Sequence, residues 1–376
     1  MATGPIAVQA PRGGAEVAAI LLEGLRGIDP ALVLLFGAEG QALSELDSGL
    51  AAGLPTDCVI AGCSSAGEIG PEGYASNCVV AIGFPRTEFR ARAMVLPNLS
   101  AMPVSVWLAG LRKMHRAFQP DPTRNHFGLL LVDGLAGQED ALVATLDAAL
   151  PSLPVIGGSA GDGLDFCRTS LLAQSKVMSN VAIFLLVETD LAIAEVTFAH
   201  FSPTPIRAVV TAAIPEKRRI LELNAEPAAR EYARLTGLDP HDLTPTEFAR
   251  HPLLLRMGRR HHVRAISAIT EDEGLSLLSA IDTGTVLTLG RADDMTQGFS
   301  DALEALPRPP LMVLAFDCIL RRLALEREGL AVCMSDMYRR YHIAGFNTYG
   351  EQHSGMHVNQ TFVGLAFMTP GGCDDA

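Results

Sequence analysis

The sequence is poor in charged and aromatic residues, and it contains no long run of apolar residues. Charged residues make up 19% of the 376 residues, aromatic residues 6%, and the net charge is −13. This acidity argues against nucleic acid or an anionic membrane as the main partner. No segment approaches the roughly 18 apolar residues that suggest a membrane span, and residues 1–14 lack the pattern of a signal peptide. We therefore expect a cytoplasmic protein.

The cysteines form no recognisable pattern. Their number, seven, is odd, they are scattered, and no CxxC motif occurs. This usage is typical of reduced thiols in a cytoplasmic protein and argues against a disulfide framework or a structural zinc site. The absence of CxxCH also excludes covalent attachment of a c-type haem.

What the sequence does contain is aliphatic residues and an internal repeat. Hydrophobic residues account for 48% of the chain, enough for a sizeable core. Residues 343–351 (IAGFNTYGE) match residues 60–68 (IAGCSSAGE) at Ile, Ala, both Gly and Glu, and residues 156–162 (IGGSAGD) form a shorter copy. An asparagine opens an apolar run after each copy, and these asparagines are Asn77, Asn180 and Asn359. Such repeats indicate a structural unit used more than once.

Each copy also has an apolar run and a helical segment upstream. The repeated unit is therefore strand, helix, strand, Gly-acidic loop, strand, which predicts an α/β fold. We expect Gly62, Gly158 and Gly345 to end core strands at equivalent places. In the last copy, residues 321–328 are expected to form a helix with Arg and Glu on its exposed face. A proline-rich stretch at 202–205 divides the chain into two interdependent lobes, 15–205 and 206–370.

Several segments resemble FIST domains, over residues 30–368. They are residues 221–224 (LELN) with Pro227 and Ala228, residues 263–266 (VRAI), and the closing block from 348–351 (TYGE) to 359–361 (NQT). The resemblance implies a bacterial sensory module that binds a small ligand and acts on a signalling partner, such as a histidine kinase or a cyclic-di-GMP enzyme. Because it covers most of the chain, we expect the output to be a separate protein. Homo-oligomerisation is left open.

The closing block is most similar to a haem-binding, nitric-oxide-sensing subgroup of FIST proteins, as are residues 317–322 (DCILRR). This similarity implies b-type haem, which needs an axial donor, an apolar slot and often an arginine near its propionates. Among ten histidines we prefer His357, which stands between the Gly-Glu loop and the next strand, and place His353 second. Met356 or Val358 would line the slot, and Arg264 would reach a propionate.

Two other functions remain open from the sequence. The first is a haem-free sensor of an amino-acid-like metabolite, in which Glu68 or Glu351 holds the amine and Arg264 the carboxylate. Tyr349 and Asn359 complete that ligand-binding set. The second, less favoured, is a thiol-dependent hydrolase using Cys63, but residues 62–67 (GCSSAG) are not a nucleophile elbow. We therefore expect no catalytic activity.

Overall fold

The computed structural model describes residues 4–13, 16–37, 40–258, 260–353 and 355–370. Helices and sheets confirm the α/β class. By packing, the chain divides into two compact units. Unit 1 comprises Met1–Thr197, Ser300–Met356 and Phe362–Ala376, and unit 2 comprises Phe198–Phe299 and His357–Thr361. These packing units are not the consecutive lobes 15–205 and 206–370, which as domains stay a prediction.

Unit 1 is built, within the described residues, from three copies of one strand arrangement. In the first copy, β2 (Pro30–Phe36) is parallel to β3 (Val59–Cys63) and antiparallel to β6 (Cys78–Pro85). The second copy uses β8 (Asn125–Val132), β9 (Val155–Ser159) and β12 (Val181–Thr189) in the same way. The third uses β22 (Met312–Cys318), β23 (Ile343–Thr348) and β26 (Phe362–Met368).

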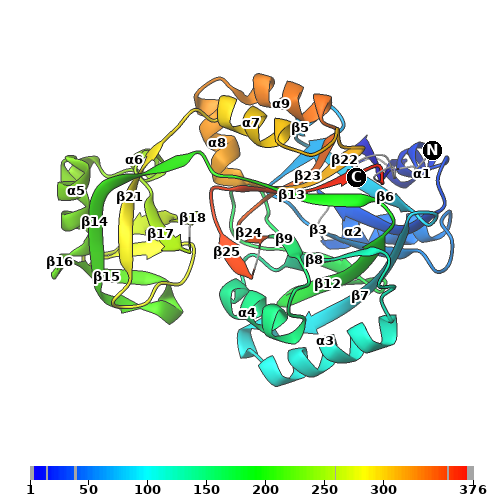
Figure 1. Ribbon diagram of the computed structural model, residues 1–376, viewed down its shortest axis with the longest axis horizontal. Helices are drawn as coiled ribbons and strands as arrows, with labels where there is room; N and C mark the ends of the chain where they lie inside the picture. Colours follow the sequence, from blue (N-terminus) through cyan, green and yellow to red (C-terminus); the bar gives the residue numbers. More distant parts are fainter. Residues whose placement is uncertain (1–3, 14–15, 38–39, 259, 354, 371–376) are drawn as a thin grey trace. The chain divides into compact units, whose positions relative to one another are not determined.

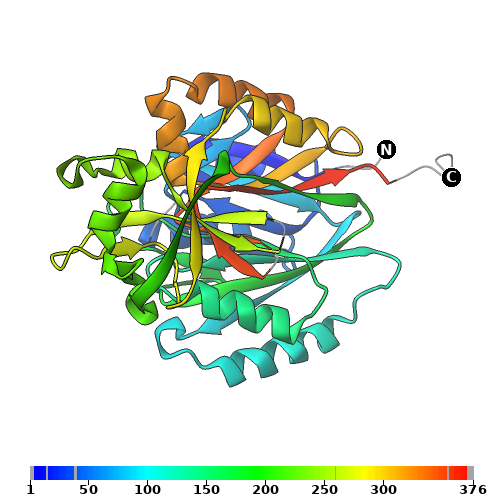
Figure 2. The same ribbon diagram turned by 60° about the vertical axis from the view of Figure 1, so that its left-hand side comes forward.

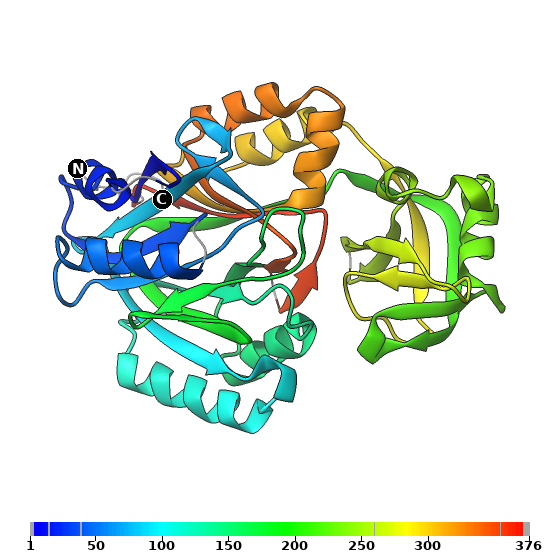
Figure 3. The same cartoon turned by 180° about the vertical axis from the view of Figure 1, so that it is seen from behind.

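An outer strand and a group of helices complete each copy. The outer strands are β1 (Ile6–Pro11), β7 (Phe89–Pro97) and β13 (Ala192–Phe198), which pair with β6, β12 and β26. The helices are α1 (Val17–Gly24) and α2 (Gly40–Ala51); α3 (Val104–Phe118) and α4 (Glu139–Ala149); and α7 (Gln297–Glu304), α8 (Ile319–Arg327) and α9 (Ala331–Arg340). Figure 3 shows these three groups on the outside of the strands, and α8 and α9 pack against β22 and β23 (Figure 1).

The copies exchange β-hairpins, so that none completes its own sheet. The hairpins are β4 (Gly67–Gly70) with β5 (Gly73–Ala75), β10 (Leu171–Ala173) with β11 (Lys176–Met178), and β24 (Glu351–His353) followed by β25 (Met356–Val358). The first strand of each hairpin pairs with another copy: β4 with β23, β10 with β3, and β24 with β9. The exchange closes into a cycle, which makes the copies mutually dependent for strand pairing.

The strand register corrects one predicted equivalence. Gly62 lies opposite Leu35, Gly345 opposite Ala315, and the corresponding residue opposite Leu130 is Gly157, not Gly158. A Cβ atom at Gly62, Gly157 or Gly345 would stand 2.3, 2.0 or 1.9 Å from the carbonyl oxygen of the neighbouring strand. Glycine is needed at this position because the two parallel backbones approach too closely for any side chain.

The residue that leads into the last strand differs from the prediction in the third copy. Asn77 and Asn180 both have φ of 56°, in the left-handed region that asparagine tolerates well. In the third copy the left-handed residue is Gln360, with φ of 53°, and not Asn359. The turn is therefore shared by the copies, but in the third copy it lies one residue later than Asn359 suggested.

The acidic position is present in two copies only. Each hairpin places one residue opposite the residue that follows the packing glycine. That residue is Glu68 opposite Phe346, Glu351 opposite Gly158, and Leu171 opposite Cys63. Leu171 thus takes the place of the acid in the second copy. Asp162, predicted as the equivalent acid, lies instead in a longer loop of that copy.

Aromatic side chains from all three copies meet in one core. The ring of Phe367 contacts those of Phe84, Phe89 and Phe127 at centroid distances of 5.9, 5.4 and 5.7 Å. These four residues come from β26, β6, β7 and β8. Burial of such large rings supplies much of the stability of a domain. The core therefore holds together the same copies that the hairpins join.

Unit 2 is an insertion between β13 and α7, within the third copy. Its sheet has the strand order β18-β17-β21-β14-β15-β20-β19. The strands are β14 (Phe201–Ile214), β15 (Arg219–Leu223), β16 (Glu226–Pro227), β17 (Leu253–Met257), β18 (Arg260–Arg264), β19 (Ile266–Ile269), β20 (Leu275–Leu277) and β21 (Val286–Ala292). Helices α5 (Ala228–Thr236) and α6 (Pro245–Arg250) accompany them, and β14 appears as the long green strand in Figure 2. Unit 2 has its own buried core, centred on Tyr232, Phe248 and Leu287.

Candidate functional site

The two predicted ligand-binding glutamates are buried and bonded within their own copies. The Ser65 hydroxyl donates to the Glu68 carboxylate at 2.8 Å, and the Thr348 hydroxyl donates to Glu351 in the same way. Glu68 is 4% exposed and Glu351 is fully buried. In both copies the hydroxyl group and the carboxylate of the same turn are therefore hydrogen-bonded to each other. It does not present the carboxylates at the protein surface.

Burial raises the pKa of Glu68 above its ordinary value, against the opposing effect of the Ser65 hydrogen bond. When the pKa of a carboxyl group is higher in the folded than in the unfolded state, the protein loses stability as the pH rises through the interval between the two pKa values. We therefore expect Glu68→Gln to be more stable than the wild type at pH 7, with the difference shrinking as pH falls toward 4. Urea unfolding at several pH values measures this. A constant difference at all pH values would contradict it.

Tyr349 contacts the longer loop of the second copy and holds it in place. Its hydroxyl donates to the carboxylate of Asp162, and its ring stacks on Phe166 at 4.3 Å. Asp162 also accepts from the backbone N–H groups of Phe166, Cys167 and Arg168 at 2.9, 2.8 and 2.7 Å. Burial opposes ionisation of Asp162, but these hydrogen bonds outweigh it and lower its pKa. The contacts give Tyr349 a positioning role for the loop.

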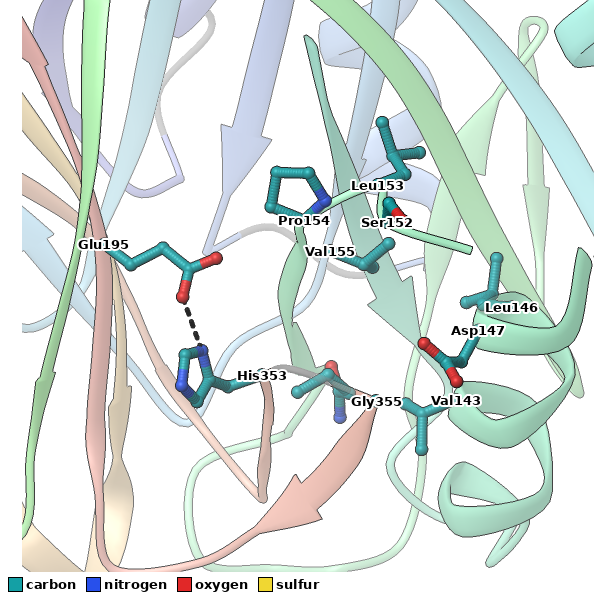
Figure 4. Close-up of a pocket in the computed structure, with 11 residues that line it drawn as sticks. Val143, Leu146, Asp147, Ser152, Leu153, Pro154, Val155, Glu195, His353 and Gly355 are labelled. Atoms are coloured by element: carbon teal, nitrogen blue, oxygen red, sulfur yellow. Dashed lines mark ion pairs between the residues drawn. The ribbon is translucent and has the colours of Figure 1, made fainter. Parts of the chain in front are cut away.

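A pocket of about 310 Å³ lies in unit 1 beside His353 (Figure 4). Its walls come from α4, from the segment leading into β9, from β13 and from the β24 hairpin. Its apolar side chains are those of Val143, Leu146, Leu153, Pro154 and Val155. The polar lining residues are equally numerous, and they are Asp147, Ser152, Glu195, Gln352 and His353. A cleft in which polar groups converge beside an apolar wall is a common form of small-ligand site.

The His353 imidazole is held at both ring nitrogens. Its Nδ1 lies 3.1 Å from Glu195 Oε2, and its Nε2 lies 3.4 Å from Thr197 Oγ1. Residues two apart on a strand point to the same face, so β13 presents Glu195 and Thr197 to the ring together. A carboxylate on one imidazole nitrogen fixes the tautomer and orientation of the ring, which is how ligating histidines are commonly held. The contact to Thr197 is at the long limit of a hydrogen bond.

The remaining predicted haem and ligand residues lie elsewhere. In unit 2, Arg264 Nη1 donates to the backbone carbonyl oxygen of His357 at 3.4 Å, and Ser279 Oγ donates to Asn359 Oδ1 at 2.5 Å. Arg264 and His357 are buried, at 6% and 2% exposure. His357 thus shares a packing unit with Arg264, whereas His353 and the half-buried Met356 belong to unit 1.

Sequence reasoning missed the partners of His353. Glu195 is the one charged residue in the strand 191–198 (LAIAEVTF), whose other polar residue is Thr197. A single acid in such a strand was the available signal, since acidic residues are depleted in strands. Asp147 gave no comparable signal, because an acid on an amphipathic helix is ordinary.

Cys63 does not have the environment of a nucleophile. It is fully buried on β3, and burial raises the pKa of its thiol well above the usual range. A reactive cysteine needs an accessible, stabilised thiolate. The geometry therefore gives no support to the thiol-dependent hydrolase.

Two features are absent from the described residues, a metal-ligating cluster and a membrane-spanning helix. No group of three or more His, Cys, Asp or Glu side chains there is arranged to hold a bare metal ion. None of the helices there is both long and apolar enough to cross a membrane.

Comparison with known proteins places both parts of the chain in one family. The sequence model of the FIST N domain matches residues 31–226, which is more than half of the chain. The model of the FIST C domain matches residues 228–354. A search of curated proteins returned no match.

Proposed function

Because the chain belongs to the FIST-domain family of sensory proteins, we propose that it binds b-type haem and senses nitric oxide, with His353 as the axial ligand. The observation that supports this choice is the buried His353 ring, oriented by Glu195 in a pocket that has an apolar wall. The proposal moves the ligand from His357, which the sequence favoured, to His353.

The lining residues fit the iron and the face of the ring. His353 Nε2 supplies a nitrogen donor, and its contact of 3.4 Å to Thr197 Oγ1 is weak enough to be exchanged for a metal. Val143, Leu146 and Val155 supply an apolar wall. No arginine or lysine occurs among the described lining residues, and Asp147 has the same charge as a propionate, so these residues would hold the iron and the ring face but not the propionates. A pocket of 310 Å³ would enclose only part of the macrocycle.

In this arrangement the protein would orient the His353 ligand and keep water away from the iron. Glu195 accepts the Nδ1 proton of His353 and so makes Nε2 a better donor. The apolar wall keeps water from the iron, and ferrous haem would supply an open axial position for nitric oxide. The signal would leave through a partner protein, for which the resemblance implies a histidine kinase or a cyclic-di-GMP enzyme.

We expect His353→Ala, expressed with haem supply, to lose most of its bound haem or to shift its Soret band, because the axial donor is removed. Added imidazole should partly restore the spectrum. Glu195→Gln should keep haem but shift the band, since the ligand is then a weaker donor. Absorption spectra with and without nitric oxide measure all three effects.

Two matched histidine variants decide the assignment. His126→Ala removes a histidine of β8 that lies outside the pocket, with its Nε2 3.5 Å from Glu188 Oε2. This variant should keep the wild-type spectrum. His357→Ala tests the ligand that the sequence favoured. If His357→Ala loses haem while His353→Ala retains it, the ligand is His357. If the wild type takes up no haem, the haem proposal is wrong.

A second candidate is a haem-free sensor of a small cationic metabolite. It is favoured by the two carboxylates of the same pocket, Asp147 and Glu195, which suit an ammonium group. The apolar wall would then receive the aliphatic part of the ligand. Calorimetric titration of the haem-free protein with small aliphatic amines tests it. Saturable binding that Asp147→Asn abolishes supports this candidate, and absence of binding removes it.

A further inference from the structure

A second pocket in unit 1 carries the opposite charge. Its volume is about 470 Å³, and it lies where the end of α7, the proline-rich segment 305–311 and the end of α9 meet. It shares no lining residue with the pocket at His353. The lining includes three potentially cationic side chains, those of Arg308, Arg340 and His342. In a chain of net charge −13 this local excess of positive charge is unusual.

The two guanidinium groups come from different elements. Arg308 lies in the proline-rich segment, where its Nη1 donates to the carbonyl oxygen of Thr369 at 3.2 Å. Arg340 ends α9, and its Cζ lies 5.4 Å from the centroid of the Tyr341 ring. Basic residues at a helix C-terminus often serve only to balance the helix dipole. That explanation applies to Arg340, but it does not explain Arg308, which lies on another segment.

Backbone strain holds the third cationic side chain at this pocket. His342 has φ of 52°, in the left-handed region, at a helix end where glycine or asparagine is usual. This conformation costs a residue with a Cβ about 1 kcal/mol. Its backbone is fixed on both sides, since its N–H donates to Arg339 O at 3.3 Å and its carbonyl accepts from Val313 N at 3.1 Å. These two hydrogen bonds hold the exposed His342 at the pocket.

We propose that this pocket binds a phosphorylated small molecule with a flat ring, of the size of a mononucleotide. Two guanidinium groups that line one pocket suit a phosphate, because it carries more charge and more acceptor oxygens than a single carboxylate. Pro307, Pro309 and Tyr341 supply flat apolar surfaces for the ring. Glu304 is the one carboxylate in the described lining, and it accepts from the Ser300 hydroxyl at 3.1 Å. It reduces the positive potential without cancelling it.

Calorimetric titration at low salt tests the site with three probes: adenosine monophosphate, adenosine and inorganic phosphate. We expect saturable binding of the mononucleotide with a Kd of about 1 mM or tighter, weaker binding of phosphate and weaker still of adenosine. Binding should fall as salt is added, because exposed charges are screened. Arg308→Ala and Arg340→Ala should each weaken the mononucleotide about tenfold, whereas Glu304→Gln should strengthen it.

Opposite shifts from Arg340→Ala and Glu304→Gln distinguish a charged site from a general loss of structure. Neither residue makes the contact to Thr369, so both variants stay informative if Arg308→Ala unfolds. Arg26→Ala is the matched control, because Arg26 is exposed and lines another pocket beside Glu23 and Asp29. The proposal is overturned if the wild type binds none of the probes, if Arg340→Ala and Arg26→Ala bind the mononucleotide equally, or if Glu304→Gln weakens binding.

Discussion

Replacing Arg321 by alanine is expected to lower the free energy of unfolding by about 3–5 kcal/mol. Arg321 and Asp317 are both fully buried, and Arg321 Nη1 lies 2.9 Å from Asp317 Oδ1. Tyr338 donates to the other carboxylate oxygen at 2.8 Å, and Tyr74 donates to it as well. Removing the guanidinium group leaves the Asp317 carboxylate in the interior without its counter-charge, which is far costlier than losing an exposed ion pair.

Urea unfolding of Arg321→Ala measures the effect, and Arg327→Ala is its control. Arg327 lies in the last turn of the same helix but is exposed, so its loss should change the free energy of unfolding by less than about 0.5 kcal/mol. The double variant Asp317→Ala with Arg321→Ala should lose less than the sum of the single variants, because no lone charge remains. Equal stability of Arg321→Ala and Arg327→Ala would show that the buried pair contributes little.

The same helix shows how far sequence reasoning reaches. Residues 321–328 were expected to form a helix with Arg and Glu on an exposed face, and α8 is present with Glu326 and Arg327 exposed. However, Arg321 is fully buried and Arg322 is 9% exposed. Arg322 Nη1 donates to Asn347 Oδ1 and to Ala75 O, on two other segments of unit 1. A charged residue is assigned to the surface by default, and only its distant partners reverse that assignment.

Repeated local patterns were the predictable part of the fold. The apolar runs that became β2, β8 and β22 are strong local signals, and they are sufficient for the α/β class. The exchange of hairpins is not local. Residues such as Leu172 and Gly62 pair across 110 positions, 172 minus 62, and nothing in either segment specifies the other. Unit 2 was likewise taken as the start of a second lobe, because its insertion is visible only when β26 is seen beside β13.

The candidate site likewise has a part that local sequence patterns predict and a part that depends on non-local contacts. The sequence favoured His357 for its place between the Gly-Glu loop and the next strand, which is a local pattern, and placed His353 second. Its partner Glu195 belongs to a strand far back in the chain, and their contact depends on how β13 and the β24 hairpin fold. The error of one residue at Gly158 has a related cause. Two adjacent glycines look alike in sequence, and only the carbonyl oxygen of Leu130 identifies Gly157 as the one that must lack a side chain.

The most severe effect of a single methyl group is expected at Gly345. A Cβ atom there would lie 1.9 Å from the carbonyl oxygen of Ala315 and 2.7 Å from its carbonyl carbon. These are backbone atoms of the central parallel pair β22–β23, so no side-chain rotation relieves the contact and the strands themselves must separate. We expect Gly345→Ala to lower the free energy of unfolding by about 3 kcal/mol or more, at the upper end of overpacking effects.

Gly27→Ala separates this steric effect from the general difference between glycine and alanine. A Cβ atom at Gly27 meets nothing within 4 Å, so this variant should be neutral or slightly stabilised, by up to about 1 kcal/mol. Gly157→Ala should behave like Gly345→Ala, because its Cβ would stand 2.0 Å from Leu130 O. Thermal and urea unfolding of the three variants measure these differences. If Gly345→Ala and Gly157→Ala unfold with the same midpoint as Gly27→Ala, the close backbone approach at these two strand pairs is not a feature of the folded protein.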